Sequence, residues 1–256
     1  YGDWLPRASA SIFYAVACGI VSCAVNDFFD RGEDLWYKTN AFDHDTATGL
    51  AFVVLLVAAT LALAAAFALT WDWQVLPLTA VGVLIAWWYS DNLFMKATVG
   101  VRLKDHFVLE MLAMSLGYAA FFWASLGING VALTNAWPLV VLVAVDFAGR
   151  TVKKDLADVA KDRRVGNMTI PVVFGEAAAK RVLDTTTVIN CLLLTLFVVQ
   201  SKMPAAALAA LIVVALEIVF RRYSRWLSQW RYFLDAHPFF LVISVGTLLD
   251  GLTFAG

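Results

Sequence analysis

Charged residues are scarce in this sequence. Asp, Glu, Lys and Arg make up 15% of its 256 residues, whereas hydrophobic residues make up 61% and the mean hydropathy is +0.75. Soluble domains carry about 25% charged residues, and about half of a small protein's surface must face water, so this composition excludes an ordinary soluble fold. It also excludes a disordered chain, because such chains are poor in apolar residues. The composition therefore indicates an integral membrane protein that crosses the lipid bilayer several times.

Net charge, cysteine pairs and flexible linkers are also few or absent. The formal net charge of −1 provides no basic surface for nucleic acid, so no nucleic-acid partner is predicted. Cys18, Cys23 and Cys191 lie in apolar stretches without a CxxC pair, and we interpret them as small apolar side chains. No stretch rich in Gly, Pro or Ser divides the chain, so we predict a single transmembrane domain over residues 1–256.

Eight apolar segments are candidates to cross the bilayer, because a spanning helix needs about 20 mostly apolar residues. The predicted spans cover residues 9–26, 48–70, 74–90, 107–127, 131–149, 183–200, 204–220 and 238–256. The sequence therefore predicts an all-α, polytopic transmembrane helical bundle.

The polar connections between these spans predict the orientation of the chain. With helices that run up and down, the four long connections fall on one membrane face: 27–47, 91–106, 150–182 and 221–237. They carry 17 of the 19 Lys and Arg residues, all except Arg7 and Lys202. Because basic residues concentrate on the cytoplasmic side of membrane proteins, we expect this face to be cytoplasmic.

Carboxylates follow the first predicted span at a regular spacing. Asp27, Asp30 and Asp34 are three and four residues apart. On a helix this spacing places them on one face, where like charges repel one another unless a cation lies between them. Oxygen ligands of this kind suit Mg²⁺, which also keeps water and substrate phosphate as ligands.

The same spacing recurs after the fifth predicted span, at Asp155, Asp158 and Asp162. Solvated helix ends are the alternative explanation for either set. Two sets with one spacing, each at the end of a span and on the same predicted face, favour a joint metal site instead. We therefore predict that all six aspartates are catalytic Mg²⁺ ligands, whose metals clamp a diphosphate between the two sets.

Nearby basic residues are candidate ligands of that diphosphate. Arg102 and Lys104 precede the fourth predicted span, and Lys153 and Lys154 lie next to Asp155. Arg recognises phosphate through two hydrogen bonds, and Lys acts as a point charge. The orientation signal described above is the alternative explanation for each of them.

Both acidic segments resemble the signature motifs of the UbiA superfamily of intramembrane prenyltransferases. Residues 26–34 match NDxxDxxxD in full. The second motif, DxxDxxxDxxxGxxTxP, is met by Asp155, Asp158, Asp162, Gly166, Thr169 and Pro171. Residues 89–104 match more weakly, and the rest of the chain agrees only in its hydropathy and loop pattern.

This resemblance implies a bundle of nine spans, with Mg²⁺ bound by both motifs and a prenyl tail in a central cavity. It implies an enzyme that ionises a polyprenyl diphosphate within the membrane and transfers the prenyl group to a hydrophobic or aromatic acceptor, with release of pyrophosphate. Asn26 would orient a phosphate oxygen or a metal-bound water. In the family the first motif ends the second helix, whereas here it ends the first. We therefore expect that one N-terminal helix is missing from this sequence, which also begins without Met.

Two departures from the family pattern leave the acceptor open. Residues 40–49 lack the Arg and Pro that members with aromatic acceptors usually have, and the loop that begins Tyr89-Ser90 lacks the usual Pro-Pro. A terpene cyclase of the same superfamily, in which the prenyl chain is its own acceptor, is therefore the second hypothesis. A cation carrier or transporter is a remote third, because such a protein has no need of the Gly-Thr-Pro tail of the second motif.

Aromatic and ionisable residues within the spans are further candidates. Trp88 and Tyr89 lie close to the predicted active face and would stabilise a carbocation or bind the prenyl chain, with lipid contact as the alternative explanation. Ionisable residues within spans, such as Glu110, are expensive to bury and often functional. For Asp146, an ion pair with Arg150 one helical turn later is the simplest account.

Overall fold

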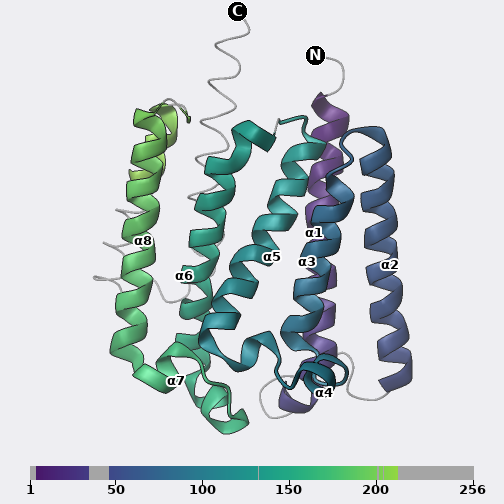
Figure 1. Ribbon diagram of the computed structural model, residues 1–256, viewed down its shortest axis with the longest axis vertical. Coiled ribbons are helices and arrows are strands. Elements are labelled where there is room, and N and C mark those ends of the chain that lie inside the picture. The colour runs from purple at the N-terminus through teal and green to yellow at the C-terminus, as the bar shows by residue number, and fades with distance from the viewer. Residues whose placement is uncertain (1–3, 35–45, 132, 201, 204, 213–256) are drawn as a thin grey trace, which may run out of the picture. The chain divides into compact units, whose positions relative to one another are not determined.

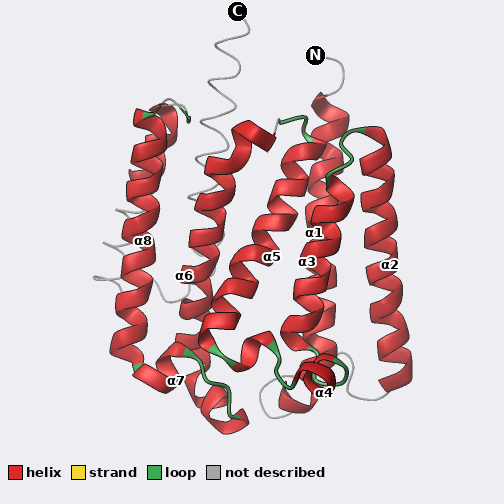
Figure 2. Cartoon of the chain, viewed as in Figure 1, coloured by secondary structure: helices red, strands yellow, loops and turns green. Residues whose placement is uncertain are grey.

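The protein is helical throughout the part that the structure describes (Figure 2). The computed structural model describes residues 4–34, 46–131, 133–200, 202–203 and 205–212. The chain divides into two compact units, residues 1–184 and 185–256. Within the described ranges, the one β-type pairing is an isolated bridge between His106 and Met168. The predicted all-α fold class is confirmed.

Five long helices and three short ones lie wholly in the first unit. They are α1 (Trp4–Asp34), α2 (Thr46–Thr70), α3 (Val75–Ser90), α4 (Met95–Val99), η1 (Leu103–Asp105), α5 (Phe107–Ile128), α6 (Leu133–Val165) and α7 (Ile170–Phe174). The long helices run up and down, so that α1, α3 and α6 end where α2 and α5 begin (Figure 1). The short helices α4 and α7 lie at this same end, the polar end of the first unit.

Four of the described helices are long and apolar enough to cross a membrane: α1, α2, α5 and α8 (Glu176–Val199). They contain or largely overlap the predicted spans 9–26, 48–70, 107–127 and 183–200. Helix α3 is apolar but shorter, and the predicted span 131–149 is part of the longer helix α6. Of the last two predicted spans, 204–220 is described only in part and 238–256 lies outside the described residues. The count of eight spans therefore stays a prediction.

An apolar core joins α1, α2, α3 and α5 in the first unit. Tyr14, Val53, Val75 and Phe121 are buried in it. Helices α3 and α5 approach closely because α3 has no side chain at Gly82, where a Cβ atom would lie 2.5 Å from the ring of Phe121. Such small residues allow close helix packing in membranes, where lipid removes the usual hydrophobic driving force.

Helix α6 is long enough to extend beyond a bilayer. Its 33 residues span about 50 Å at about 1.5 Å per residue, whereas the hydrocarbon core is about 30 Å thick. The aspartates of the second motif lie in its carboxyl-terminal part, at the polar end. One continuous helix, α6, therefore contains both the apolar segment of the predicted span and the charged segment with the second motif.

The second unit begins within α8 and continues into the short helix η2 (Ala205–Leu208). After Val199 the chain turns, and the Lys202 amide donates to the carbonyl oxygen of Phe197 at 2.8 Å. This turn agrees with the short connection predicted between the sixth and seventh spans.

Candidate active site

The first motif lies at the end of α1, where Asp30 is the member that enters the site. Asp30 is 5% exposed and forms an ion pair with Lys104. Asn26 accepts a hydrogen bond from the Ser90 hydroxyl at 3.1 Å, which fixes the end of α1 against α3. Asp27 is half-buried. Asp34 ends α1, and its side chain lies outside what the structure describes.

The second motif lies on α6, as its spacing predicts. Asp155 and Asp162 are 4% and 6% exposed, and Asp158 between them is half-buried. All three line one pocket. The helical spacing of three and four residues therefore brings the carboxylates to one face of the helix.

The tail of the second motif folds back onto its last aspartate. The side chains of Asn167 and Thr169 both donate to the carboxylate of Asp162, each at 3.3 Å. The chain can reverse here because Gly166 adopts a φ of +83°, which L side chains rarely adopt. Pro171 then lies in the first turn of α7, where it lacks only an N–H that the helix leaves unpaired. Thr169 and Asn167 thus hold Asp162 in place, and Gly166 allows the chain to turn back to it.

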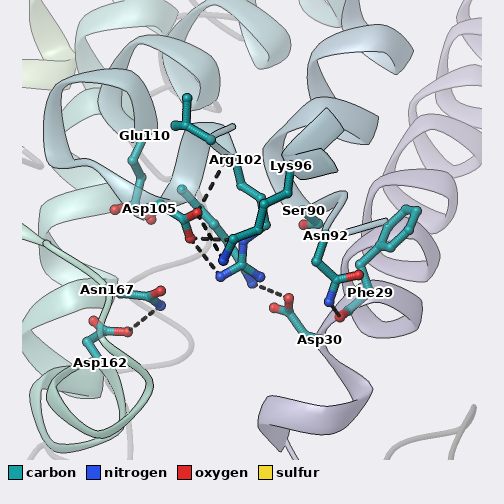
Figure 3. Close-up of polar contacts among 12 residues, drawn as sticks. Phe29, Asp30, Ser90, Asn92, Lys96, Arg102, Asp105, Glu110, Asp162 and Asn167 are labelled. Carbon is teal, nitrogen blue, oxygen red and sulfur yellow. Dashed lines mark hydrogen bonds and ion pairs between the residues drawn. The ribbon is translucent and has the colours of Figure 1, made fainter. Parts of the chain in front are cut away.

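The connection between α3 and α5 supplies the basic residues. Lys104, in η1, is 5% exposed and reaches Asp30 on α1. Arg102 donates instead to Asp105, with 2.9 Å between Nε and Oδ1 (Figure 3). Burial alone would raise the pKa of the Asp105 carboxyl, but the hydrogen bonds and charge of Arg102 lower it overall. In this structure Arg102 therefore binds a carboxylate of its own loop.

Several contacts that the sequence did not indicate fix this connection to both motifs. The Asn92 side chain donates to the carbonyl oxygen of Phe29 at 3.0 Å (Figure 3). On the other side, the Phe107 amide donates to the carbonyl oxygen of Met168 at 3.0 Å, next to the bridge between Met168 and His106. The connection therefore links the end of α1 to the end of α6.

These elements enclose a pocket at the polar end of the first unit. Its volume is about 340 Å³ with its open mouth included. It is lined by Asp30, Tyr89, Lys104, Glu110, Lys154, Asp155, Asp158, Lys161, Asp162 and Asn167. The pocket thus combines members of both predicted aspartate sets with three lysines.

The pocket includes only some of the predicted site residues. The structure brings together Asp30, Asp155, Asp158, Asp162, Lys104, Lys154 and Tyr89. It does not place Asn26, Asp27, Arg102, Lys153 or Trp88 among the lining residues. Trp88 donates its indole N–H to the carbonyl oxygen of Val101 at 3.3 Å, so it supports the connection that carries Lys104.

Glu110, Lys161 and Asn167 line the pocket although the sequence did not assign them to the site. One feature of the sequence pointed to Glu110: it is an ionisable residue at the start of an apolar segment. The phenol of Tyr89 donates to its Oε1 atom at 2.7 Å. The other ionisable residue considered in this way, Asp146, pairs with Arg150 as predicted.

The carboxylates of α6 are crowded. Burial raises the pKa of Asp155 to about 8, and the charges of Glu110 and Asp162 act in the same direction. Burial raises the pKa of Asp162 as well. Both shifts mean that negative charge in this pocket is unfavourable unless a cation is added.

The acidic side chains of the pocket offer only oxygen atoms as ligands. A hard divalent cation prefers such ligands, so these side chains fit one. Among the described residues, no group of three or more acidic, His or Cys side chains is arranged as a ready metal site. Asp30 is instead neutralised by the ammonium group of Lys104.

Comparison with known proteins agrees with the motifs. The family model described as the UbiA prenyltransferase family matches residues 2–243. No curated protein matches the sequence significantly.

Two solved structures share the fold over nearly the whole chain. A UbiA homolog from Archaeoglobus fulgidus bound to GPP and Mg²⁺ is 17% identical, with a TM-score of 0.74 over 98% of this chain and 88% of that one. The structure bound to DMAPP and Mg²⁺ is also 17% identical, with a TM-score of 0.72 over 94% and 85% of the two chains. At this identity the likeness concerns the fold.

The family match covers far more than half of the chain, and it agrees with the four apolar helices of an integral membrane protein. This protein belongs to the UbiA prenyltransferase family.

Proposed function

We propose that this protein is a Mg²⁺-dependent enzyme that ionises a polyprenyl diphosphate within the membrane and transfers the prenyl group to an acceptor, releasing pyrophosphate. One observation carries the proposal: a single pocket contains Asp30 of the first motif, the three aspartates of the second motif and three lysines. A diphosphate needs both kinds of group, since carboxylates would hold divalent cations that neutralise part of its charge and ammonium groups would neutralise the rest.

The metal ligands in this proposal are the six aspartates: Asp27, Asp30, Asp34, Asp155, Asp158 and Asp162. When bound, Mg²⁺ supplies the Lewis acid that neutralises the departing pyrophosphate. Lys104 and Lys154 bind diphosphate oxygens, and Lys161 joins them from the same wall. Asn26, Arg102 and Lys153 lie outside the present pocket and would bind the outer part of the diphosphate after side-chain movement.

The prenyl chain requires an apolar environment beside the pocket. Tyr89 and Glu110 form the wall where the polar end meets α3 and α5, two helices with apolar sequences. We propose that the prenyl chain enters the bundle at this wall, where lipid and helices exclude water from the allylic cation. The aromatic faces of Tyr89 and Trp88 would stabilise that cation.

The single domain over residues 1–256 and the cytoplasmic orientation of the active face belong to the same proposal. Both rest on the sequence, through the absence of a linker and the placement of basic residues. The Archaeoglobus fulgidus homolog supports the substrate class, because its structures contain GPP or DMAPP together with Mg²⁺.

The direct test is pyrophosphate release by the purified protein with geranylgeranyl diphosphate as probe, in Mg²⁺ and in EDTA. We expect release only with Mg²⁺, and we expect Asp30→Ala and Asp158→Ala each to abolish it. Glu176→Ala is the matched control, since Glu176 is an exposed carboxylate at the start of α8. Full activity in either aspartate variant would contradict the two-motif site, and absence of release from the unmodified protein, both with and without an added acceptor, would favour the cation carrier.

A terpene cyclase is the second candidate, favoured by the altered sequence of residues 40–49. The same assay separates the two activities when no acceptor is added. A cyclic hydrocarbon formed from the probe alone would identify a cyclase, whereas a transferase needs the acceptor to form its product.

A further inference from the structure

Glu110 is a buried carboxylate of the pocket that belongs to neither aspartate motif. It is 4% exposed and lies in the first turn of α5. Its Oε1 atom accepts the phenol hydrogen of Tyr89, but Oε2 is buried and has no hydrogen-bond partner within the described part of the chain. A buried polar atom without a partner is unfavourable, and such atoms are rare unless they have a function.

The other groups of the pocket are already engaged. Asp30 is paired with Lys104, and both oxygens of Asp162 accept hydrogen bonds. Under the proposed function, the aspartates of both motifs bind metal, and the lysines bind diphosphate oxygens. Among the described side chains, Glu110 Oε2 is therefore a pocket carboxylate oxygen that remains able to accept a proton.

The proposed reaction must release a C–H proton whenever a carbon–carbon double bond is the nucleophile. Cleavage of the allylic C–O bond leaves its electron pair on pyrophosphate and a cation on the prenyl chain. A carbon–carbon double bond, in an acceptor or in the same chain, attacks this cation and forms a new C–C bond. The product cation then loses a proton, and the electrons of that C–H bond restore a double bond.

We propose that Glu110 accepts this proton through Oε2. The assignment rests on the proposed function. Glu110 is well placed to accept the proton, because it lies where the diphosphate pocket meets the apolar helices α3 and α5. The reacting carbons of a bound prenyl diphosphate lie next to its phosphate oxygens, and therefore close to this wall.

Tyr89 acts as a positioning residue for Glu110. Its hydrogen bond occupies Oε1 and leaves Oε2 as the accepting atom. Lys154 lies with its Nζ atom 5.9 Å from the centroid of the Tyr89 ring, so a positive charge flanks the pair. In Tyr89→Phe the phenolic hydroxyl is lost, so the Glu110 carboxylate would stay in place but be less well oriented.

The test compares two readouts in Glu110→Gln, which keeps the shape of the side chain and an oxygen for the Tyr89 bond. The purified protein is incubated with Mg²⁺ and geranylgeranyl diphosphate, and pyrophosphate release is measured alongside the ratio of olefin to prenyl alcohol. Olefins arise by proton loss and the alcohol by capture of water. We expect the olefin-to-alcohol ratio to fall at least tenfold, and to fall by more than pyrophosphate release does.

Three further variants make the result specific. Glu110→Asp should recover part of the ratio, Tyr89→Phe should give an intermediate ratio, and the exposed Glu176→Gln should change neither readout. An unchanged ratio in Glu110→Gln would overturn the assignment, as would a ratio that falls only in proportion to pyrophosphate release. Failure of the unmodified protein to release pyrophosphate is a distinct result, which refutes the proposed function itself.

Discussion

At the scale of single residues, two carboxylates in and beside the pocket are each paired with a basic side chain. The Asp30 carboxylate is neutralised by Lys104, and Asp105 is neutralised by Arg102. The first pair joins distant parts of the chain, because Asp30 and Lys104 are 74 residues apart, whereas Arg102 and Asp105 belong to one loop. The charge of Lys104 therefore stands next to a carboxylate that the proposed function assigns to Mg²⁺.

Loss of Lys104 should destabilise the metal-free protein. In Lys104→Met, Asp30 stays buried without its partner, and breaking a buried ion pair costs about 3–5 kcal/mol. We expect a clearly lower Tm in detergent with EDTA, and recovery of most of the loss when Mg²⁺ is added. Lys96→Met is the control, because Lys96 is half exposed and its ion pair with Asp105 is 3.8 Å long. An equal loss in both variants would contradict the special role of Lys104.

The raised pKa of Asp155 predicts how stability depends on pH. A carboxyl whose pKa is about 8 in the folded protein and about 4 in the unfolded chain binds a proton in the folded state between these values. Folding is then favoured at low pH, so the metal-free protein should lose stability as the pH rises from about 4 to about 8. Because Mg²⁺ competes with that proton, its stabilising effect should increase over the same interval.

Melting curves recorded in EDTA and in Mg²⁺ across this interval provide the measurement. In Asp155→Asn the group no longer titrates, so the pH dependence in EDTA should become flatter. The same slope in this variant and in the unmodified protein would assign the effect to other groups.

At the scale of elements, the site depends on how α6 ends. The chain leaves the helix at Gly166, whose amide donates to the carbonyl oxygen of Asp162 at 2.9 Å. It then joins the connection between α3 and α5 through the bridge at His106 and Met168. The end of α6 thereby positions Asp162 and the segment next to Lys104.

A matched pair of glycine variants tests this helix end. A Cβ atom has open space at both Gly166 and Gly19, but only Gly166 has a positive φ. Gly166→Ala should therefore destabilise the protein by about 1–2 kcal/mol through backbone strain, while Gly19→Ala in α1 should be neutral or stabilising. Thermal unfolding in detergent measures both, and similar Tm values in the two variants would argue against a strained turn.

At the scale of the whole molecule, apolar helices separate two ends of the first unit. The polar end contains the pocket, while the opposite end contains the turn between α2 and α3 and a small polar cluster. In that cluster the Ser11 and Ser125 hydroxyls are 2.6 Å apart, and the Asn129 side chain donates to Ser11 at 2.8 Å. The distribution of Lys and Arg predicts that the polar end faces the cytoplasm.

Labelling of single cysteines tests this orientation. In a protein whose three natural cysteines are replaced by Ala, Arg164→Cys reports on the polar end and Trp73→Cys on the opposite end. Both positions are exposed. In intact cells, a membrane-impermeant thiol reagent should label position 73 and reach position 164 only after lysis. The reverse pattern would show that the active face lies outside the cytoplasm.

The sequence by itself determined the class, the approximate positions of most described helices and seven of the ten residues that line the pocket. Its low charge required a membrane environment, and apolar runs located α2, α3 and α5 to within a few residues. The aspartates of α6 could be predicted because their spacing is a property of one helix. The helices α1 and α6 proved longer than the predicted spans, because hydropathy detects where a helix meets lipid and not where its hydrogen bonds end.

The partners of the remaining side chains were decided only by the tertiary structure. Lys104 and Arg102 are equivalent in the sequence, yet Lys104 reaches Asp30 on α1 whereas Arg102 binds Asp105 in its own loop. Glu110 enters the pocket because α3 and α5 pack closely enough for Tyr89 to reach it. Such pairings depend on distances between segments far apart in the chain, and neither hydropathy nor residue spacing carries that information.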